Sequence, residues 1–337
     1  MTTPLRILAA GDPYITAAAF HHGLRARLDA AHDLEVFQVG DVTPARLPGV
    51  REYAGDPAAL AGRVAGFDVL VVHGAAVTSE VLASPGLRLV CCARGGPVNV
   101  DVAAAHERGV PVTNTPGKNA AAVVELTLAF MIMLARGLPR AQEFLLAGGE
   151  LGASTFEGAE FFGGELGGRA LGVVGYGQVG RRVARAATAL GMDVNAHDPM
   201  VDPESFEPGV RSASLERLLA CSDIVSLHAR ATAENENLMS RDQFAAMQRG
   251  SLFINTARES LVDEEALRSA LENGHLGGAA LDVVRPAPGR NPLLGRPNVI
   301  ITPHVGGATF ETIDRGIAMV ADEIARLASG EALRHRV

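Results

Sequence analysis

The sequence predicts an α/β fold made of two doubly wound, parallel-sheet domains. Short runs rich in Val, Ile and Leu alternate with helical patterns along the chain, and near-continuous apolar runs are typical of strands that helices cover on both faces. The 337 residues fit about two domains at roughly 150 residues each. The 38 glycines, beside only 4% aromatic residues, indicate many turns and close backbone approaches.

The first series of elements contains strands expected at residues 5–10, 33–39, 67–73 and 87–93, with helical stretches such as 102–108 between them. The turn signal Asn-Thr-Pro-Gly follows at residues 114–117. A helix expected over about 119–136 is apolar almost all round, which predicts that it is buried or covered by another subunit.

A glycine-rich segment, residues 148–168, precedes the second series. Its strands are expected at residues 170–175, 193–198, 223–228, 251–256, 278–283 and 298–302, with helices over 178–190, 263–273 and 309–329. The alternation again predicts a parallel sheet.

Charge and apolar content exclude several classes of partner. Thirty Lys and Arg against 38 Asp and Glu give a net charge of −8 without a basic block, so we expect neither nucleic acid nor a membrane as partner. The longest apolar stretch, residues 126–135, is too short to span a bilayer, and the N-terminal run is too short for a signal peptide. Cys91, Cys92 and Cys221 have no metal-ligand spacing, so no metal is expected and a reducing cytoplasm fits.

The motif GYGQVG at residues 175–180 follows an expected strand and opens an expected helix. In a dinucleotide-binding unit, such glycines allow a tight turn, approach of the backbone to the pyrophosphate, and close helix–strand packing. Asp198 ends the next strand, where a carboxylate accepts hydrogen bonds from the ribose hydroxyls and repels a 2′-phosphate. The motif therefore predicts NAD rather than NADP. The expected contacts are Gly175, Gly177, Gln178, Val179, Gly180 and Asp198.

Three polar residues stand at the ends of later strands in the same domain: Arg258, Asp282 and His304. Taken singly, an Arg is usually a solvated charge and a His is usually structural. Ligands of doubly wound sheets, however, bind beyond the carboxyl ends of the strands. A guanidinium that binds a carboxylate and a His that exchanges a proton are the groups that hydride transfer to a 2-oxo acid requires.

Five segments together resemble the D-isomer-specific 2-hydroxyacid dehydrogenases, in order and in spacing. They are NTPGKNAAAVVELTL, LGVVGYGQVGRRVA, SLFINTARESLVDEEAL, GGAALDV and VIITPHVGGAT. The resemblance implies two Rossmann-like domains with the active site in the cleft between them, the first completed by the C-terminal helix. It also implies NAD-dependent interconversion of 2-oxo and D-2-hydroxy acids, and a homodimer joined through the NAD-binding domain.

The resemblance also assigns boundaries and roles. It implies a substrate domain over residues 1–112 and 306–337 and an NAD-binding domain over 113–305. Arg258 matches the substrate-binding Arg, and His304 matches the acid/base that also lies beside the cofactor. The remaining expected contacts are Asp282 near the nicotinamide carboxamide, Thr256 and Ala257 beside the cofactor, and the N–H groups of Gly95 and Gly96 on the substrate carboxylate.

One expected residue is missing. The family's His-pairing Glu matches Ala287, and no carboxylate lies between Asp282 and His304. Three explanations stay open: a shifted alignment in this Pro-rich segment, a His304 that works without the partner, or a carboxylate from elsewhere, with Glu259 the local candidate. The same loss favours an alternative function, an NAD(H)-binding regulator with weak or no turnover. The intact Arg258 and His304 favour the enzyme.

The sequence leaves the identity of the substrate open. Cys92 replaces an Arg common in the phosphoglycerate branch, which makes Arg94 the expected substrate-binding charge in that loop. Arg94, His73 and Lys118 are candidates for binding a polar or acidic substrate tail, and each is alternatively a solvated charge. Arg230 stands where Pro is common. Without room for a regulatory domain after residue 337, 3-phosphoglycerate is disfavoured.

Overall fold

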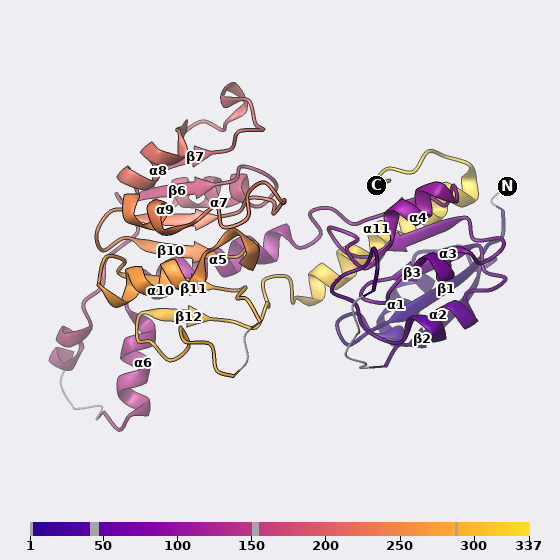
Figure 1. Ribbon diagram of the computed structural model, residues 1–337, viewed down its shortest axis with the longest axis horizontal. Helices are drawn as coiled ribbons and strands as arrows, with labels where there is room; N and C mark the ends of the chain where they lie inside the picture. Colours follow the sequence, from indigo (N-terminus) through magenta and orange to yellow (C-terminus); the bar gives the residue numbers. More distant parts are fainter. Residues whose placement is uncertain (1–2, 41–46, 150–154, 287–288) are drawn as a thin grey trace. The chain divides into compact units, whose positions relative to one another are not determined.

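The computed structural model describes residues 3–40, 47–149, 155–286 and 289–337. The chain divides into two compact units, Met1–Asn119 with Ala308–Val337, and Ala120–Gly307. Each unit is built around one parallel sheet with helices on its faces (Figure 1). The predicted fold class, two doubly wound parallel sheets, is confirmed.

The sheet of the first unit has the order β2-β1-β3-β4-β5, so the chain reverses direction across the sheet between β1 and β3. Its strands are β1 (Arg6–Gly11), β2 (Asp33–Gln38), β3 (Val69–Val72), β4 (Leu89–Cys92) and β5 (Val112–Thr113). Its helices are α1 (Ala17–Arg25), α2 (Pro57–Arg63), α3 (Ser79–Leu82), α4 (Val102–Glu107) and α11 (Phe310–Ser329).

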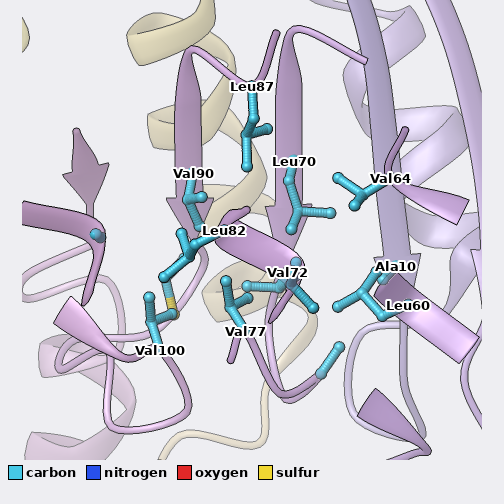
Figure 2. Packing of buried hydrophobic residues seen from close by; sticks show 14 of the residues in the cluster. Ala10, Leu60, Val64, Leu70, Val72, Val77, Leu82, Leu87, Val90 and Val100 are labelled. Atoms are coloured by element: carbon cyan, nitrogen blue, oxygen red, sulfur yellow. The ribbon is translucent and has the colours of Figure 1, made fainter. Parts of the chain in front are cut away.

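The β3 strand shows why its sequence is a continuous apolar run. Its side chains alternate between two hydrophobic clusters, with Leu70 and Val72 on one face of the sheet and Val69 and Val71 on the other. Figure 2 shows the first cluster, in which residues of α2 and α3 pack on the sheet. Because both faces are covered, all four residues of β3 are buried, which accounts for the unbroken apolar run.

The C-terminal helix α11 covers the second face of this sheet. Ile317, Val320 and Ile324 of α11 are buried in the same cluster as β1 and β3. Gly23 of α1 allows α11 to approach closely, since a Cβ on Gly23 would lie 2.8 Å from Cγ2 of Ile317. The chain therefore returns to complete its first unit.

The second sheet has the order β12-β11-β10-β9-β6-β7-β8, with the reversal between β6 and β9. Its strands are β6 (Ala170–Val174), β7 (Asp193–His197), β8 (Val210–Ser212), β9 (Ile224–Leu227), β10 (Leu252–Asn255), β11 (Gly278–Leu281) and β12 (Val299–Ile301). The helices of this unit are α5 (Ala120–Ala135), α6 (Leu138–Leu146), α7 (Gly180–Ala189), α8 (Leu215–Cys221), α9 (Arg241–Ala246) and α10 (Glu264–Glu272), with the 3-10 turns η1 (Thr155–Phe161), η2 (Pro203–Ser205) and η3 (Glu259–Leu261).

The two compact units are divided after Asn119 and after Gly307, and the expected domain boundaries stay a prediction. The expected first domain ends at residue 112, whereas the first unit continues to Asn119. Within this stretch, β5 pairs with β4 through Val112 and Thr113 and thus belongs to the first sheet. At the second crossing the unit boundary follows Gly307 rather than residue 305.

The helices α5 and α6 differ in how far their own unit covers them. One side of α5 is buried, including Phe130 and Met131, while Ile132 is 43% exposed. None of the α6 residues is buried. Among the described residues no single helix is long and apolar enough to cross a membrane, although α5 and α6, bent by 69°, meet that length and composition test as a pair.

Candidate active site

Each of the three glycines in the GYGQVG motif meets a different structural requirement. Gly175 has a φ of +93°, and a Cβ there would lie 2.5 Å from the backbone nitrogen of Ala229. A Cβ on Gly180 would overlap the carbonyl oxygen of Gly175, so this glycine lets α7 begin against the strand. Gly177 has open space where its Cβ would be. The loop thus leaves room beside Gly177 for a group that approaches the backbone closely.

The start of α7 offers donors beside that space. Among the described residues no group accepts a hydrogen bond from the N–H of Gln178, Val179 or Gly180. Unpaired N–H groups at a helix start, together with the helix dipole, favour a bound phosphate. The loop and the helix therefore fit a dinucleotide pyrophosphate.

Asp198 follows β7 and lies beside the glycine loop. Its Oδ2 accepts a hydrogen bond from Tyr176 N (2.7 Å), and its Oδ1 accepts one from Met200 N (3.0 Å). The side chain is half-buried, so it keeps accessible acceptor capacity. Neither Pro199 nor Met200 supplies a positive charge for a 2′-phosphate.

Backbone hydrogen bonds join the segments that carry the three strand-end residues. The N–H of Asp282 donates to the carbonyl of Asn255 (2.9 Å), and the N–H of His304 donates to the carbonyl of Asp282 (2.9 Å). Arg258 is three residues beyond Asn255. The structure thus brings the ends of β10, β11 and β12 together at one edge of the sheet, as the sequence predicts.

Asp282 organises the turn that carries His304. The carboxylate is 2% exposed, and it accepts hydrogen bonds from Thr302 Oγ1 (2.6 Å), Val305 N (2.8 Å) and Gly306 N (2.8 Å). His304 itself has a φ of +56°, a left-handed conformation that is uncommon for a side chain of this size. The contact of Asp282 with the nicotinamide carboxamide stays a prediction.

The side chains of His304 and Arg258 are both exposed. The His304 ring makes no hydrogen bond or ion pair with the described residues of its own unit. The Arg258 guanidinium donates one hydrogen bond, from Nη1 to the carbonyl of Ala257 (2.7 Å), and its other donors are available.

Thr256 and Ala257, the two expected cofactor contacts before Arg258, each make a hydrogen bond to another residue of the protein. Thr256 is 8% exposed, and its hydroxyl lies 3.0 Å from that of Thr127 on α5. The N–H of Ala257 donates to Asn255 Oδ1 (2.9 Å). Their contact with a cofactor stays a prediction.

The matching position for the family's Glu, Ala287, lies outside the described residues. The segment just before it is held in place, because Arg285 N donates to the Glu264 carboxylate and Arg285 Nη2 donates to Asn237 Oδ1 (2.7 Å). No carboxylate of the described part of this unit, Glu259 included, hydrogen-bonds to the His304 ring.

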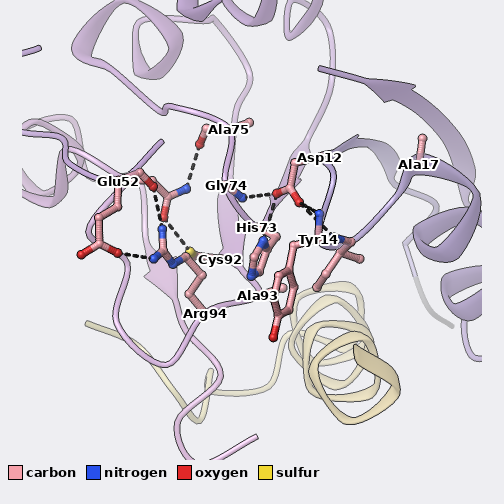
Figure 3. A network of polar contacts seen from close by, with 12 residues as sticks. Asp12, Tyr14, Ala17, Glu52, His73, Gly74, Ala75, Cys92, Ala93 and Arg94 are labelled. Atoms are coloured by element: carbon pink, nitrogen blue, oxygen red, sulfur yellow. Dashed lines mark hydrogen bonds and ion pairs between the residues drawn. The ribbon is translucent and has the colours of Figure 1, made fainter. Parts of the chain in front are cut away.

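In the first unit, Gly95 and Gly96 are exposed after β4, and no described group accepts a hydrogen bond from their N–H groups. Both are available for a carboxylate. Arg94 has an internal partner instead: its guanidinium donates to the carbonyl and the carboxylate of Glu52 (Figure 3). Cys92 is fully buried, and burial raises the pKa of its thiol to about 11, so it carries no charge at neutral pH.

Two further candidate residues at strand ends escaped the sequence analysis. Asp12, at the end of β1, is 2% exposed and hydrogen-bonds to His73. His228, at the end of β9 beside the glycine loop, has its Nε2 2.8 Å from Ser226 Oγ, and burial lowers its pKa to about 3. Both follow buried strands next to the point where the strand order reverses, and that position was the available signal.

Comparison with known proteins identifies the family. Residues 128–306 match the model of the D-isomer specific 2-hydroxyacid dehydrogenase, NAD binding domain. The D-3-phosphoglycerate dehydrogenase of Archaeoglobus fulgidus is 36% identical over 276 residues, which are 80% of this chain and 51% of that protein. The hydroxypyruvate reductase of Thermotoga maritima is 38% identical over 260 residues, which are 75% of this chain and 82% of that protein.

The solved structures agree. The crystal structure of the TT0316 protein from Thermus thermophilus has a TM-score of 0.81 at 34% identity and covers 99% of this chain and 100% of its own. The chain spans about half the length of the phosphoglycerate dehydrogenases it matches, at 50–51% of each. On the family model and these relatives, the chain belongs to the D-isomer specific 2-hydroxyacid dehydrogenases.

Proposed function

We propose that the protein is an NAD-dependent oxidoreductase that interconverts a 2-oxo acid and a D-2-hydroxy acid by hydride transfer. The observation that carries the proposal is the hydrogen-bonded junction of three strand ends, which gathers the segments of Arg258, Asp282 and His304 in the unit that also holds the glycine loop. Family membership supports the same chemistry.

The residues present fit NAD. The N–H groups of Gln178, Val179 and Gly180 would hold the pyrophosphate, and Asp198 would hold the adenosine ribose. When bound, NAD exchanges a hydride with carbon 2 of the substrate. We place Thr256, Ala257 and Asp282 around the nicotinamide, on the strength of the resemblance.

The protein's own side chains and backbone groups bind the substrate and exchange its proton. Arg258 binds the substrate carboxylate and polarises the oxygen on carbon 2, for which its available donors suit it. The exposed His304 ring exchanges a proton with that oxygen. Gly95 and Gly96 of the first unit bind the carboxylate through their N–H groups. An active site between the two units stays a prediction.

We also propose a homodimer joined through the second unit. Leu138, Phe144, Leu145 and Leu146 of α6 are 45%, 41%, 37% and 79% exposed, and Phe162 is 87% exposed. A nine-residue helix with no buried residue is marginal in isolation, since helices shorter than about 12–15 residues are barely stable in water. In Figure 1, α6 extends away from the sheet of its own unit. A second copy would cover this apolar surface.

A reducing cytoplasm is the proposed location. Cys91 and Cys92 are buried free thiols, and Cys221 is a half-buried one. Unpaired thiols are usual in the cytoplasm, where disulfides are rare.

NADH should bind at least tenfold more tightly than NADPH, which corresponds to about 1.4 kcal/mol. The reason is Asp198, whose carboxylate repels a 2′-phosphate, followed by uncharged residues. Fluorescence titration of both cofactors measures the two dissociation constants. Equal constants would remove Asp198 from the cofactor site.

The wild type should oxidise NADH with a 2-oxo acid, and two substitutions should impair this differently. Arg258→Ala should weaken binding of oxalate strongly and of NADH little, whereas His304→Ala should lower kcat by roughly 10²–10⁴-fold, the usual contribution of acid–base catalysis. Arg241→Ala, an exposed arginine on α9, is the control. Tight NADH binding without turnover of any 2-oxo acid would favour the NAD(H)-binding regulator.

Asp282→Asn should disturb the His304 turn. An amide offers one acceptor oxygen, and its NH₂ faces backbone N–H groups that need acceptors, which costs about 1–3 kcal/mol. We expect a lower free energy of unfolding in urea and a lower kcat with NADH binding retained. Asp263→Asn is the control, because Asn caps a helix as well as Asp does. Unchanged kcat and stability would show that Asp282 does not position His304.

Leu146→Glu should shift the protein from two chains to one in sedimentation, because it places a charge in the proposed apolar interface. Met200→Glu is the control, at a side chain 90% exposed on another part of the same unit. A wild type that sediments as one chain contradicts the homodimer.

A further inference from the structure

Arg258 is placed through its backbone rather than through its side chain. Among the described residues, its guanidinium makes a single hydrogen bond, to the carbonyl of the neighbouring Ala257 (2.7 Å), and the side chain is exposed. A contact with the adjacent residue moves with the backbone and does not fix it. The direction in which Arg258 presents its remaining donors therefore depends on what holds the chain before and after it.

Before Arg258, the sheet holds the backbone. Asn255 is the last residue of β10 and is 1% exposed. Its side chain bridges the residues that follow, since Oδ1 accepts a hydrogen bond from Ala257 N (2.9 Å) and Nδ2 donates to the carbonyl of Arg258 (3.0 Å). The chain up to Arg258 is thus tied to a buried side chain of the sheet.

After Arg258, the chain enters the short turn η3, which a neighbouring loop supports. The N–H of Asn237 donates to the carbonyl of Ser260 (2.8 Å), and the N–H of Met239 donates to the carbonyl of Leu261 (2.9 Å). Asn237 has a φ of +53°, a left-handed conformation that Asn adopts more readily than most residues. The downstream side of Arg258 therefore depends on a loop whose own backbone has an uncommon conformation.

The guanidinium of Arg285 joins η3 to that loop. Its Nη2 donates to Asn237 Oδ1 (2.7 Å) and to the carbonyl of Ser260 (3.3 Å), so both protons of this nitrogen are used. A planar guanidinium holds two such acceptors in a fixed geometry. Its Nη1 lies 3.6 Å from Glu236 Oε1, but the two side chains are 39% and 58% exposed, and an exposed ion pair contributes little stability. The main contacts of Arg285 are therefore with η3 and its supporting loop.

The backbone of Arg285 is itself held in place. Its N–H donates to the carboxylate of Glu264, the first residue of α10. The segment follows β11, which pairs with β10 and β12 on its two sides. The resemblance places a partner for His304 in this segment, whereas the described part of it contacts the turn that follows Arg258.

We propose that Arg285 is a positioning residue for Arg258. The Arg285 guanidinium fixes η3 against the Asn237 loop, and η3 fixes the backbone downstream of Arg258, so that the donors of Arg258 are aimed at the substrate carboxylate. Arg285 acts through Arg258 and not through a contact with substrate or cofactor. This inference rests on the proposed function and adds a residue to the same site.

Arg285→Met keeps an apolar stem and removes the donors. We expect the dissociation constant of oxalate from the NADH complex to rise about tenfold and that of NADH to change by less than about twofold, because a small displacement of a binding group weakens a bidentate contact. Calorimetric titration measures both constants, and kcat/KM for a 2-oxo acid should fall with the oxalate affinity. Arg296→Met is the matched control, since Arg296 also donates to a carbonyl, that of Pro292, and pairs with a carboxylate, that of Glu272. It precedes β12 at the opposite, amino edge of the sheet.

A double-variant cycle separates positioning from a general loss of structure. If Arg285 acts through Arg258, Arg285→Met should lower kcat/KM little further once Arg258 is replaced by Ala, because changes at coupled residues are not additive. Two losses that simply multiply in the double variant contradict the positioning role.

Asn237→Gly tests the same contact without removing a charge. Gly adopts the left-handed conformation freely, so the backbone of the loop is retained and only the acceptor for Arg285 Nη2 is lost. We expect oxalate to bind about threefold more weakly, as the loss of one hydrogen bond implies, with the free energy of unfolding in urea close to that of the wild type. Wild-type oxalate affinity in this variant and in Arg285→Met would overturn the inference.

Failure of the inference differs from failure of the proposed function. Oxalate affinity that falls in Arg258→Ala but not in Arg285→Met, or that falls equally in Arg296→Met, contradicts the inference and leaves the proposed function in place. Oxalate affinity that is unchanged in Arg258→Ala removes Arg258 from substrate binding and so counts against the proposed function itself. Because oxalate binds without being turned over, these results do not depend on which 2-oxo acid the protein reduces.

Discussion

The candidate active site depends on backbone hydrogen bonds between the ends of three parallel strands. Asn255 O accepts from Asp282 N, and Asp282 O accepts from His304 N, so the ladder of the sheet continues one step beyond the strands themselves. Parallel pairing aligns all carboxyl ends at one edge, which is why the segments of residues up to 46 positions apart in sequence lie at the same edge. That ladder holds the segments of Asp282 and His304 in register with the strand that precedes Arg258.

In both units, Asp side chains at the ends of strands hold the following turns in place. Asp12, Asp198 and Asp282 each follow a strand and accept hydrogen bonds from backbone N–H groups. Burying a carboxylate is costly, and the several hydrogen bonds that each accepts offset that cost. In every case the anchored turn presents another group: the His73 ring, the glycine loop, or the His304 ring. The two sheets thus use the same device to fix the turns at their carboxyl edges.

Features that depend on one segment alone could be predicted from the sequence. The continuous apolar run of β3 and the GYGQVG motif each express one local requirement, either burial of both faces of a strand or backbone space for a phosphate. The short strands β5 and β8, with two and three residues, gave no such pattern because their pairing is decided by their neighbours. The helix α6 was missed for a related reason, since its own unit buries none of it.

The sequence by itself determined the fold class and the dinucleotide motif, and it singled out Arg258, Asp282 and His304 as candidates, because each follows from a periodicity or a residue type at a strand end. Only the tertiary structure decided what surrounds them. Arg94, expected as a substrate-binding charge, is paired with Glu52 from a distant loop. Lys118, for which binding of a substrate tail and a solvated charge were both open, is buried under α11. Partners 42 and about 200 residues away leave no mark on local sequence, because burial and pairing are properties of the packed chain.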